Sequence, residues 1–422
     1  MSETTCERAT AVGTAEGGWY QTLVLQALGR MTLGHLHMTL PGGRTFVVGS
    51  PGAELSATVR VVNPDFFRKC VLFGDVGFGE AYLDGDWETD SLARVIAWAV
   101  TNLETNPAFA AAPGRLPLMN FLQWINRFKH WLRPNSVQTS RRNISDHYDL
   151  GNDFYRLWLD PTMTYSSAYF TRQGQGLEDA QRAKYDALCQ KVRLQASDHL
   201  LEIGSGWGGF SVHAARNYGC RITTVTISEE QYRYAKERFE REGVSDRVEI
   251  LLKDYRAVEG KFDKVVSIEM MEAIGDRYLE VYCAKLHEVL KPEGLIGLQY
   301  ITVPDCRHAD LLRGVDFIQK HIFPGSLLLS VGRVNEAMNR TGNLFLHGLE
   351  DMGASYARTL HLWWETFNQK LAEVRAQGFD DRFIRKWNYY LQYCEAAFAT
   401  RNISVVQAVY TRPHNRFLHE EF

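Results

Sequence analysis

The stretch HLLEIGSGWGGFSVHAARNY, residues 199–218, constrains the fold of this chain more than any other segment. It has the pattern of an apolar strand, a turn carrying Gly204, Gly206 and Gly208, and a helix. Glycines at such a turn allow positive φ angles and let a nucleotide-like ligand approach the backbone closely. A tight corner without a ligand can have the same spacing, so the residues around the turn have to distinguish the two interpretations.

Strand and helix patterns alternate from residue 197 onward. Strands are predicted in HLLEIG, RITTVTIS, RVEILLKD, FDKVVSIEMM and GLIGLQYITV, and helices in GGFSVHAARNY and EEQYRYAKERFEREG. This alternation predicts a doubly wound α/β sheet, which binds its ligand at the carboxyl ends of the strands. The candidate ligand contacts at those ends are Glu202, Thr226, Gln231 and Asp254. The second strand lacks the acid that usually receives the ribose of NAD, which argues against a dinucleotide.

A smaller α+β unit is predicted ahead of the sheet. Its pattern is a helix over 19–30, a hairpin turning at 41–43, a strand at 57–62, and two helices separated by a glycine-rich turn. A stretch broken by prolines then indicates a linker. We therefore divide the chain into a flexible N-terminus (1–18), the small unit (19–103), a linker (104–140) and a larger domain (141–422).

Charge and cysteine content narrow the function classes. A formal net charge of −3 provides no bulk attraction for nucleic acid. Seven cysteines without a CxxC pair predict neither a metal site nor a disulfide framework, and they indicate a reducing cytoplasm. No apolar run approaches the roughly 20 residues that span a bilayer, so any membrane contact is expected to be peripheral.

The linker carries LMNFLQWINRFKHWLRP (118–134), an amphipathic segment with basic and aromatic side chains. Such a segment either lies on an anionic lipid surface or docks on its own protein, and the sequence leaves both open. Residues 146–170 combine histidine, tyrosine and aspartate with little apolar periodicity, which predicts a lid or pocket wall. His147 in this segment is either a pocket base or a cap or core histidine.

FDKVVSIEMMEAIG (262–275) ends an apolar strand with Glu269 and Glu272 at the rim where ligands bind. These two carboxylates are either solvated acids at the start of a helix or part of the site. The residue pattern alone does not choose between these readings.

Several blocks together resemble the cyclopropane-fatty-acyl-phospholipid synthases, S-adenosylmethionine-dependent enzymes that methylate olefinic lipid chains. The blocks are VNPDFFRKCVLFGDVGFGEAYLDGDWETDSL, HYDLGNDFYRLWLDPTMTYSSAYF, IGSGWGG, VTISEEQ, KPEGL, DFIQKHIFPG and YCEAAFATRNISVVQAVYTR. They extend over nearly the whole chain in order. The resemblance implies a class I methyltransferase-like sheet, a lipid-binding N-terminal domain and a homodimer.

The resemblance also implies ligands. It places S-adenosylmethionine against Tyr165, Ser166, the Gly204–Gly208 turn, Thr226 and Gln231. In the family the alkene attacks the sulfonium methyl, and a bound bicarbonate ion then removes a proton from the resulting cation. The bicarbonate ligands correspond to Glu272, Tyr356 and the backbone around Ile301. Aromatic candidates for stabilising the cation are Tyr165, Tyr169, Phe170, Tyr356, Trp363 and Trp364.

This chain departs from the best-known family pattern. Ser167 stands at the position of the pocket cysteine, Gln299 at that of a bicarbonate-contacting histidine, and Ala273 follows Glu272 in place of histidine. Both Ser167 and Gln299 can form hydrogen bonds, but glutamine has no titratable proton. Methyl transfer is therefore the prediction, with cyclopropane as the expected product. A methylene-branched chain, or a methyl-branched chain completed by a reductase partner, stays open.

The sequence thus predicts a cytoplasmic enzyme at the inner face of the membrane that modifies unsaturated phospholipids. Two other classes remain to be distinguished. One is a small-molecule methyltransferase that has kept the sheet, and the other is a lipid-binding protein without catalysis.

Overall fold

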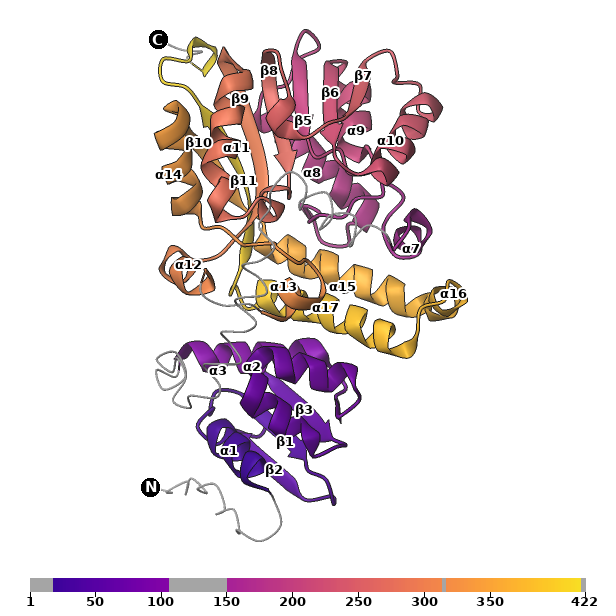
Figure 1. Cartoon of the computed structure of the whole chain (residues 1–422), viewed down its shortest axis with the longest axis vertical. Helices are drawn as coiled ribbons and strands as arrows, with labels where there is room; N and C mark the ends of the chain where they lie inside the picture. Colours follow the sequence, from indigo (N-terminus) through magenta and orange to yellow (C-terminus); the bar gives the residue numbers. More distant parts are fainter. Residues whose placement is uncertain (1–17, 106–149, 313–315, 419–422) are drawn as a thin grey trace.

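The computed structural model describes residues 18–105, 150–312 and 316–418. Its larger part is a seven-stranded sheet of order β10-β11-β9-β8-β5-β6-β7 (Figure 1). The strands are β5 (His199–Ile203), β6 (Arg221–Thr226), β7 (Val248–Leu252), β8 (Phe262–Ile268), β9 (Leu290–Thr302), β10 (Phe345–Asp351) and β11 (Ser404–Thr411). Strands β5 to β9 pair in parallel, which confirms the doubly wound sheet. The sequence did not predict β11, which pairs antiparallel with β9, or β10, which pairs antiparallel with β11.

Helices cover both faces of the sheet. They are α8 (Leu177–Lys191), α9 (Gly209–Tyr218) and α10 (Glu229–Arg241) on one face, and α11 (Asp276–Val289) and α14 (Val331–Gly342) on the other. Successive strand residues point to opposite faces, so Leu200 packs in the first core and Leu201 in the second. Two apolar cores therefore hold the strand ends in a fixed position.

The chain between β10 and β11 forms α15 (Gly353–Gln369), α16 (Leu371–Ala376) and α17 (Asp381–Ala399). Figure 1 shows α15 and α17 lying between the sheet and the N-terminal unit. Trp158, Trp363 and Trp387 are almost completely buried and meet edge to face beside them. Phe154 and Tyr155 of α7 (Asn152–Arg156) join the same core. The lid or pocket wall predicted over 146–170 is therefore wrong for this part, because these aromatic side chains are core, whereas residues 163–166 of the same stretch line the cavity described below.

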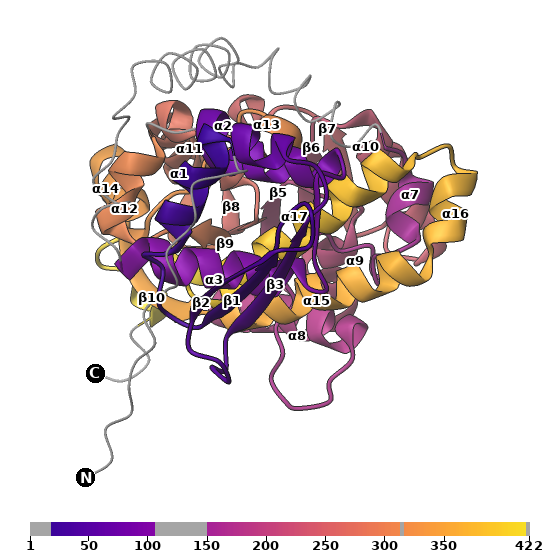
Figure 2. The same ribbon diagram turned by 90° about the horizontal axis from the view of Figure 1, so that it is seen from below.

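The N-terminal unit has a four-stranded sheet of order β2-β1-β3-β4. Its elements are α1 (Trp19–Leu28), β1 (His35–Thr39), β2 (Thr45–Gly49), β3 (Ser56–Val61), α2 (Asp65–Leu83), β4 (Trp87–Glu88) and α3 (Leu92–Thr105). The predicted hairpin is confirmed by the antiparallel pairing of β1 with β2. Helices α2 and α3 pack against α17, and Figure 2 shows this unit from below against α15 and α17.

Helix α2 corrects one prediction, since it replaces the expected short helix and glycine-rich turn. It runs through 65–83 with a kink at Gly74, where φ is 59°. Gly77 and Gly79 lie within the helix, and only glycine fits at these two positions. A Cβ would meet the Lys69 carbonyl oxygen at 2.1 Å on Gly77 and the Phe317 ring at 2.4 Å on Gly79. These glycines are therefore explained by close packing and not by a turn.

The predicted linker segment 118–134 and His147 lie outside the described residues. None of the helices in the described ranges is long and apolar enough to cross a membrane. The same ranges hold no group of three or more His, Cys, Asp and Glu side chains arranged to bind a metal ion.

Candidate active site

A cavity of about 990 Å³ opens at the carboxyl ends of β5, β6, β8 and β9, where the sheet predicts a ligand. Its polar wall is formed by the glycine turn and the strand ends. Its apolar wall comes from α2, α13 (Phe317–His321), α15 and α17, and includes Phe73, Val76, Ile318, Leu360 and Phe398. One cavity thus joins a polar edge to apolar side chains from both parts of the molecule.

The glycine turn presents two of its three glycines to this cavity. Gly204 has a φ of 95° and Gly206 a φ of 50°. A Cβ on Gly206 would meet no atom of the described residues within 4 Å, so the turn leaves open space beside its backbone. Gly208 does not line the cavity, and its Cβ would meet the Phe239 ring at 2.7 Å. The geometry therefore explains Gly208 by the packing of α9 against α10, in place of the predicted ligand contact.

Three side chains complete this polar wall. The Thr226 hydroxyl donates to the Gln231 Oε1 atom at 2.9 Å, which leaves the amide NH₂ group of Gln231 to donate to a ligand. Asp254 lines the cavity and accepts the backbone N–H of Arg256 at 2.9 Å. We call Gly204, Gly206, Thr226, Gln231 and Asp254 the cofactor edge.

Glu202 forms the floor beside the cofactor edge. Its Oε2 atom accepts from Ser211 and, at 2.6 Å, from Thr224. Burial raises the pKa of Glu202 to about 7, while the two hydroxyls and nearby Lys184 act in the opposite direction. A cationic ligand in the cavity would favour the ionised carboxylate. The open turn, the amide donor and the acidic floor together fit the positively charged S-adenosylmethionine.

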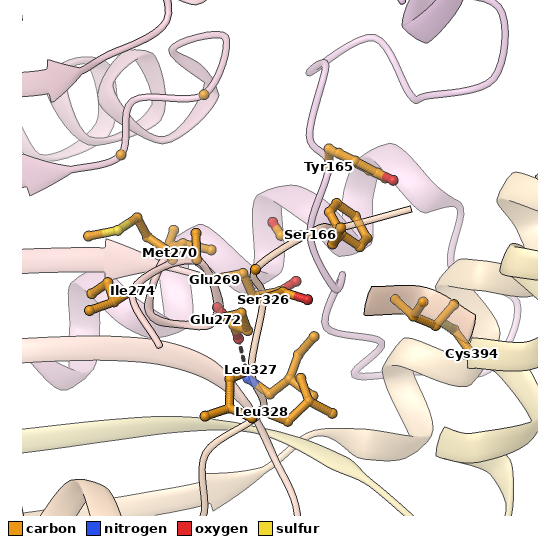
Figure 3. A pocket seen from close by; sticks show the side chains of 18 of the residues that line it. Tyr165, Ser166, Glu269, Met270, Glu272, Ile274, Ser326, Leu327, Leu328 and Cys394 are labelled. Atoms are coloured by element: carbon orange, nitrogen blue, oxygen red, sulfur yellow. Dashed lines mark hydrogen bonds between the residues drawn. The ribbon is translucent and has the colours of Figure 1, made fainter. Parts of the chain in front are cut away.

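Tyr165 and Ser166 line the cavity together with Glu269 and Glu272 (Figure 3). The hydroxyls of Tyr165 and Tyr390 are 2.8 Å apart. The Ser166 hydroxyl accepts from Lys184 at 2.7 Å. Lys184 is fully buried, and burial lowers its pKa to about 7. A buried amine therefore supports the cavity wall from behind.

Glu269 is the centre of a second polar group. Its Oε1 atom accepts the Ser167 backbone N–H and the Gln299 Nε2, each at 2.8 Å. Its Oε2 atom accepts the Tyr356 hydroxyl at 2.7 Å. Burial raises the pKa of Glu269, whereas Lys184 and the three donors lower it. Ser167 and Gln299 are almost completely buried behind Glu269, so they reach the cavity only through its carboxylate.

A chain of hydrogen bonds fixes the orientation of Gln299. Its Oε1 atom accepts from the Gln407 Nε2 at 3.0 Å, and the Oε1 atom of Gln407 accepts from Lys191. Because a lysine ammonium can only donate, the oxygen of the Gln407 amide must face Lys191 and its NH₂ group must face Gln299. The amide of Gln299 is oriented in the same way by Gln407. The NH₂ group of Gln299 must then face Glu269.

Glu272 is held differently. Its Oε1 atom accepts the Ile301 backbone N–H at 2.6 Å, whereas its Oε2 atom is buried without a hydrogen-bond partner among the described residues. Burial and the negative charge of Glu269 raise the pKa of Glu272 to about 8. Because the charge of Glu269 is one cause of the raised pKa of Glu272, Glu269 is the carboxyl of the pair that ionises first. We call Glu269 and Glu272, with their donors Ser167, Gln299, Tyr356 and Ile301, the carboxylate cluster.

The carboxylate cluster does not fit the bicarbonate ion that the family resemblance implies. Ser167, Gln299 and Tyr356 donate to Glu269, and Ile301 donates to Glu272. The donors at these four positions are thus directed to groups of the chain itself, since the Ser167 hydroxyl also donates to the Ala168 carbonyl oxygen at 2.9 Å. A further anion would lie beside the charge of Glu269 without these donors, which is unfavourable in a buried site.

The cavity also corrects the aromatic candidates. Tyr165 and Tyr356 line it, but Tyr169, Phe170, Trp363 and Trp364 do not. Sequence reasoning missed other rings that do, among them Phe323, Tyr390 and Phe398. It noted Glu269 but left its role open, because its donors lie 30 to 102 residues away in sequence. The only signal in the sequence was a second carboxylate close to Glu272.

The sheet order and the cofactor edge define a class I methyltransferase. Residues 135–408 match the family described as Mycolic acid cyclopropane synthetase. Two solved structures resemble the chain over its sheet domain. Cyclopropane synthase MmaA2 from Mycobacterium tuberculosis has 30% identity and a TM-score of 0.60 over 64% of this chain and 98% of that chain. Mycolic acid cyclopropane synthase CmaA1, complexed with SAH and CTAB, has 29% identity and a TM-score of 0.61 with the same coverage.

Two curated relatives extend over most of the chain. Tuberculostearic acid methyltransferase UfaA1 of Mycobacterium tuberculosis is 35% identical over 90% of this chain and 88% of its own length. Cyclopropane-fatty-acyl-phospholipid synthase of Escherichia coli is 36% identical over 84% of this chain and 88% of its own length. The chain belongs to the mycolic acid cyclopropane synthetase family, and it is an S-adenosylmethionine-dependent methyltransferase.

Proposed function

We propose that the protein transfers a methyl group from S-adenosylmethionine to the double bond of an unsaturated phospholipid acyl chain, and that the resulting cation closes to a cyclopropane. The observation that carries this proposal is the single cavity that joins the cofactor edge to the apolar wall. An acyl chain is long and apolar, and it matches such a wall better than a small polar acceptor does.

The proposed division of work follows the two walls of the cavity. S-adenosylmethionine supplies an electrophilic methyl group when it is bound. The cofactor edge holds it, while Tyr165, Tyr356 and Phe398 offer ring faces in the same cavity. Such faces stabilise a carbocation by cation–π attraction, and an apolar wall keeps out the water that would capture it.

The N-terminal unit supports access to a lipid surface. Phe73 and Val76 of α2 reach the cavity wall. Trp19, Leu33 and Val47 of the same unit are exposed apolar side chains, and Trp19 is 59% accessible. Exposed side chains of this kind can enter the boundary of a bilayer. We therefore propose peripheral association with the cytoplasmic face of the membrane, and the homodimer remains a prediction.

A second candidate product is a methylene-branched or methyl-branched acyl chain. It shares the first methylation step, and a partner reductase would be needed for the methyl branch. The observation in its favour is the similarity to the methyltransferase named for tuberculostearic acid over 90% of this chain.

The test is incubation of the protein with S-adenosylmethionine carrying a ¹³C methyl group and vesicles of monounsaturated phospholipid. We expect label in the acyl chains, with cyclopropane methylene protons in the NMR spectrum of the lipid. A vinylidene or a methyl doublet would select the branched product. Vesicles of saturated phospholipid are the control, and transfer only to a soluble amine or hydroxyl would contradict the proposal.

A further inference from the structure

We infer that Glu269 is the base that accepts the proton from the methylated acyl cation, in the place that the family resemblance gives to bicarbonate. The inference rests on the proposed function. It assigns a catalytic role to a side chain of the protein, so that the reaction would need no bound anion from solution.

Position is the first argument. Glu269 follows the last residue of β8 and has a φ of 48°, a conformation that is uncommon outside glycine. Its backbone N–H donates to the Gln299 carbonyl oxygen at 2.7 Å, which ties this strained residue to β9. The side chain lines the cavity beside Tyr356 and Glu272. The strained residue thus carries the carboxylate that lines the reaction cavity.

The donor set is the second argument. Burial raises the pKa of Glu269, and three neutral donors act against this, because hydrogen bonds to the charged form favour that form. Burial and the charge of Glu269 raise the pKa of the Tyr356 hydroxyl well above its ordinary range, so it stays a donor. The pKa of Glu272 is about 8, so this carboxyl is mainly protonated near neutral pH. Two neighbouring carboxyls in different environments, one with three donors and one with a single donor, are an arrangement that suits one base and one acid.

The proton step balances without another reagent. The alkene π electrons form the new C–C bond as the C–S bond to the methyl group breaks, which leaves a cation on the neighbouring carbon. A C–H bond of the added methyl group then breaks, and its electrons form the last bond of the ring. The proton goes to the Glu269 carboxylate, which returns it to solvent through the cavity after the product leaves. A cation this acidic requires a well-placed base more than a strong one.

Two substitutions of Glu269 separate the possibilities. Glu269→Gln keeps the size of the side chain but removes the base, and we expect product formation to fall about 100-fold or more, with no recovery in added bicarbonate. Glu269→Gly frees the donors of Ser167, Gln299 and Tyr356, and glycine is compatible with the φ of 48°. We expect millimolar bicarbonate to restore its product formation about 10-fold or more.

The wild-type protein provides the decisive comparison. We expect its product formation to differ by less than about 2-fold between CO₂-free buffer and buffer with bicarbonate. Glu237→Gln, a substitution on the exposed face of α10, is the matched control and should behave like wild type. A wild-type enzyme that loses activity in CO₂-free buffer, or a Glu269→Gln variant that keeps its activity, would overturn the inference.

A binding measurement tests the inference without the cofactor or the lipid. ¹³C NMR with labelled bicarbonate should detect no binding to wild type and saturable binding to Glu269→Gly. Binding to wild type that Tyr356→Phe weakens would place the ion at the cluster and overturn the inference. If wild type transfers no label to any phospholipid, the proposed function fails, while this measurement still decides whether Glu269 fills the place of the ion.

Discussion

The cofactor edge and the carboxylate cluster lie on one cavity but are built in different ways. The cofactor edge depends on backbone shape, namely a glycine turn between β5 and α9 with a few side chains at the next strand ends. The carboxylate cluster depends on groups from four separate segments, namely Glu269 itself, the Ser167 backbone N–H and the side chains of Gln299 and Tyr356. The comparison teaches that the part holding a common ligand is encoded locally, whereas the part directing the reaction is assembled by the fold.

The largest expected effect tests the backbone side of this comparison. Gly204→Val places a branched side chain at a φ of 95° and its Cβ about 3.3 Å from Met270. We expect the affinity for S-adenosylhomocysteine, measured by calorimetry, to fall about 100-fold or more, equivalent to about 2.7 kcal/mol. The identity of any residual lipid product should not change.

Gly260→Val is the matched control, since Gly260 has a φ of 101° but does not line the cavity. It imposes similar backbone strain away from the ligand and should lower thermal stability with little change in affinity. Equal losses of affinity in the two variants would mean that strain, and not the open turn, explains the effect.

The difference between the two regions also explains what the sequence could predict. The glycine turn, the parallel strands and their ligand edge follow from short-range patterns, and all were predicted. Strand β10 was missed because it is an edge strand without a buried face, and β11 because its partner β9 ends about a hundred residues earlier. The long helices between them bring Tyr356 and Tyr390 to the cavity, so their place depends on those two strands.

The carboxylate cluster was predicted only in part. Glu272, Tyr356, Gln299, Ser167 and Ile301 were named from the family resemblance, and the fold brings them together. Most of them are hydrogen-bonded to Glu269. This residue has a left-handed φ of 48°, and a glutamate with positive φ cannot be predicted from the sequence pattern. The donors of Glu269 are 30 to 102 residues away in sequence, so these hydrogen bonds can be identified only from the folded structure.

The next effect tests the side-chain region. Tyr356→Phe removes the hydroxyl that donates to Glu269 at 2.7 Å. Because hydrogen bonds to charged groups contribute about 1.5–3 kcal/mol, we expect product formation to fall about 10- to 100-fold. Affinity for S-adenosylhomocysteine should stay unchanged, since Tyr356 belongs to the carboxylate cluster and not to the cofactor edge.

Tyr218→Phe is the control for this substitution. Tyr218 also donates to a carboxylate, Asp186, at 2.6 Å, but it lies outside the cavity. This variant should keep product formation within about 2-fold of wild type. A parallel loss of cofactor affinity in Tyr356→Phe would show that the two regions are not separable.

A smaller effect is expected behind the carboxylate cluster. Gln407→Met removes the amide that orients Gln299 and leaves the Gln299 Oε1 atom without its donor. We expect the turnover number to fall about 3- to 10-fold with little change in the Michaelis constant for lipid, because the loss concerns positioning. Gln392→Met is the control, as this buried glutamine accepts from Ala93 away from the cluster. A change confined to the Michaelis constant would argue against a positioning role.

The smallest effect concerns the pH dependence of stability, and it tests the protonation state of Glu272 beside Glu269. The folded protein holds a proton on Glu272 up to a pKa of about 8, whereas the unfolded chain releases it near the ordinary value of 4.5. Between these values the folded state binds more protons, so the contribution of Glu272 to stability falls as pH rises through this window. Glu272→Gln does not titrate, and its thermal midpoint should rise relative to wild type from pH 5 to 8 by a few degrees and then level off. A constant difference across this range would mean that Glu272 is ionised throughout, which would contradict its raised pKa.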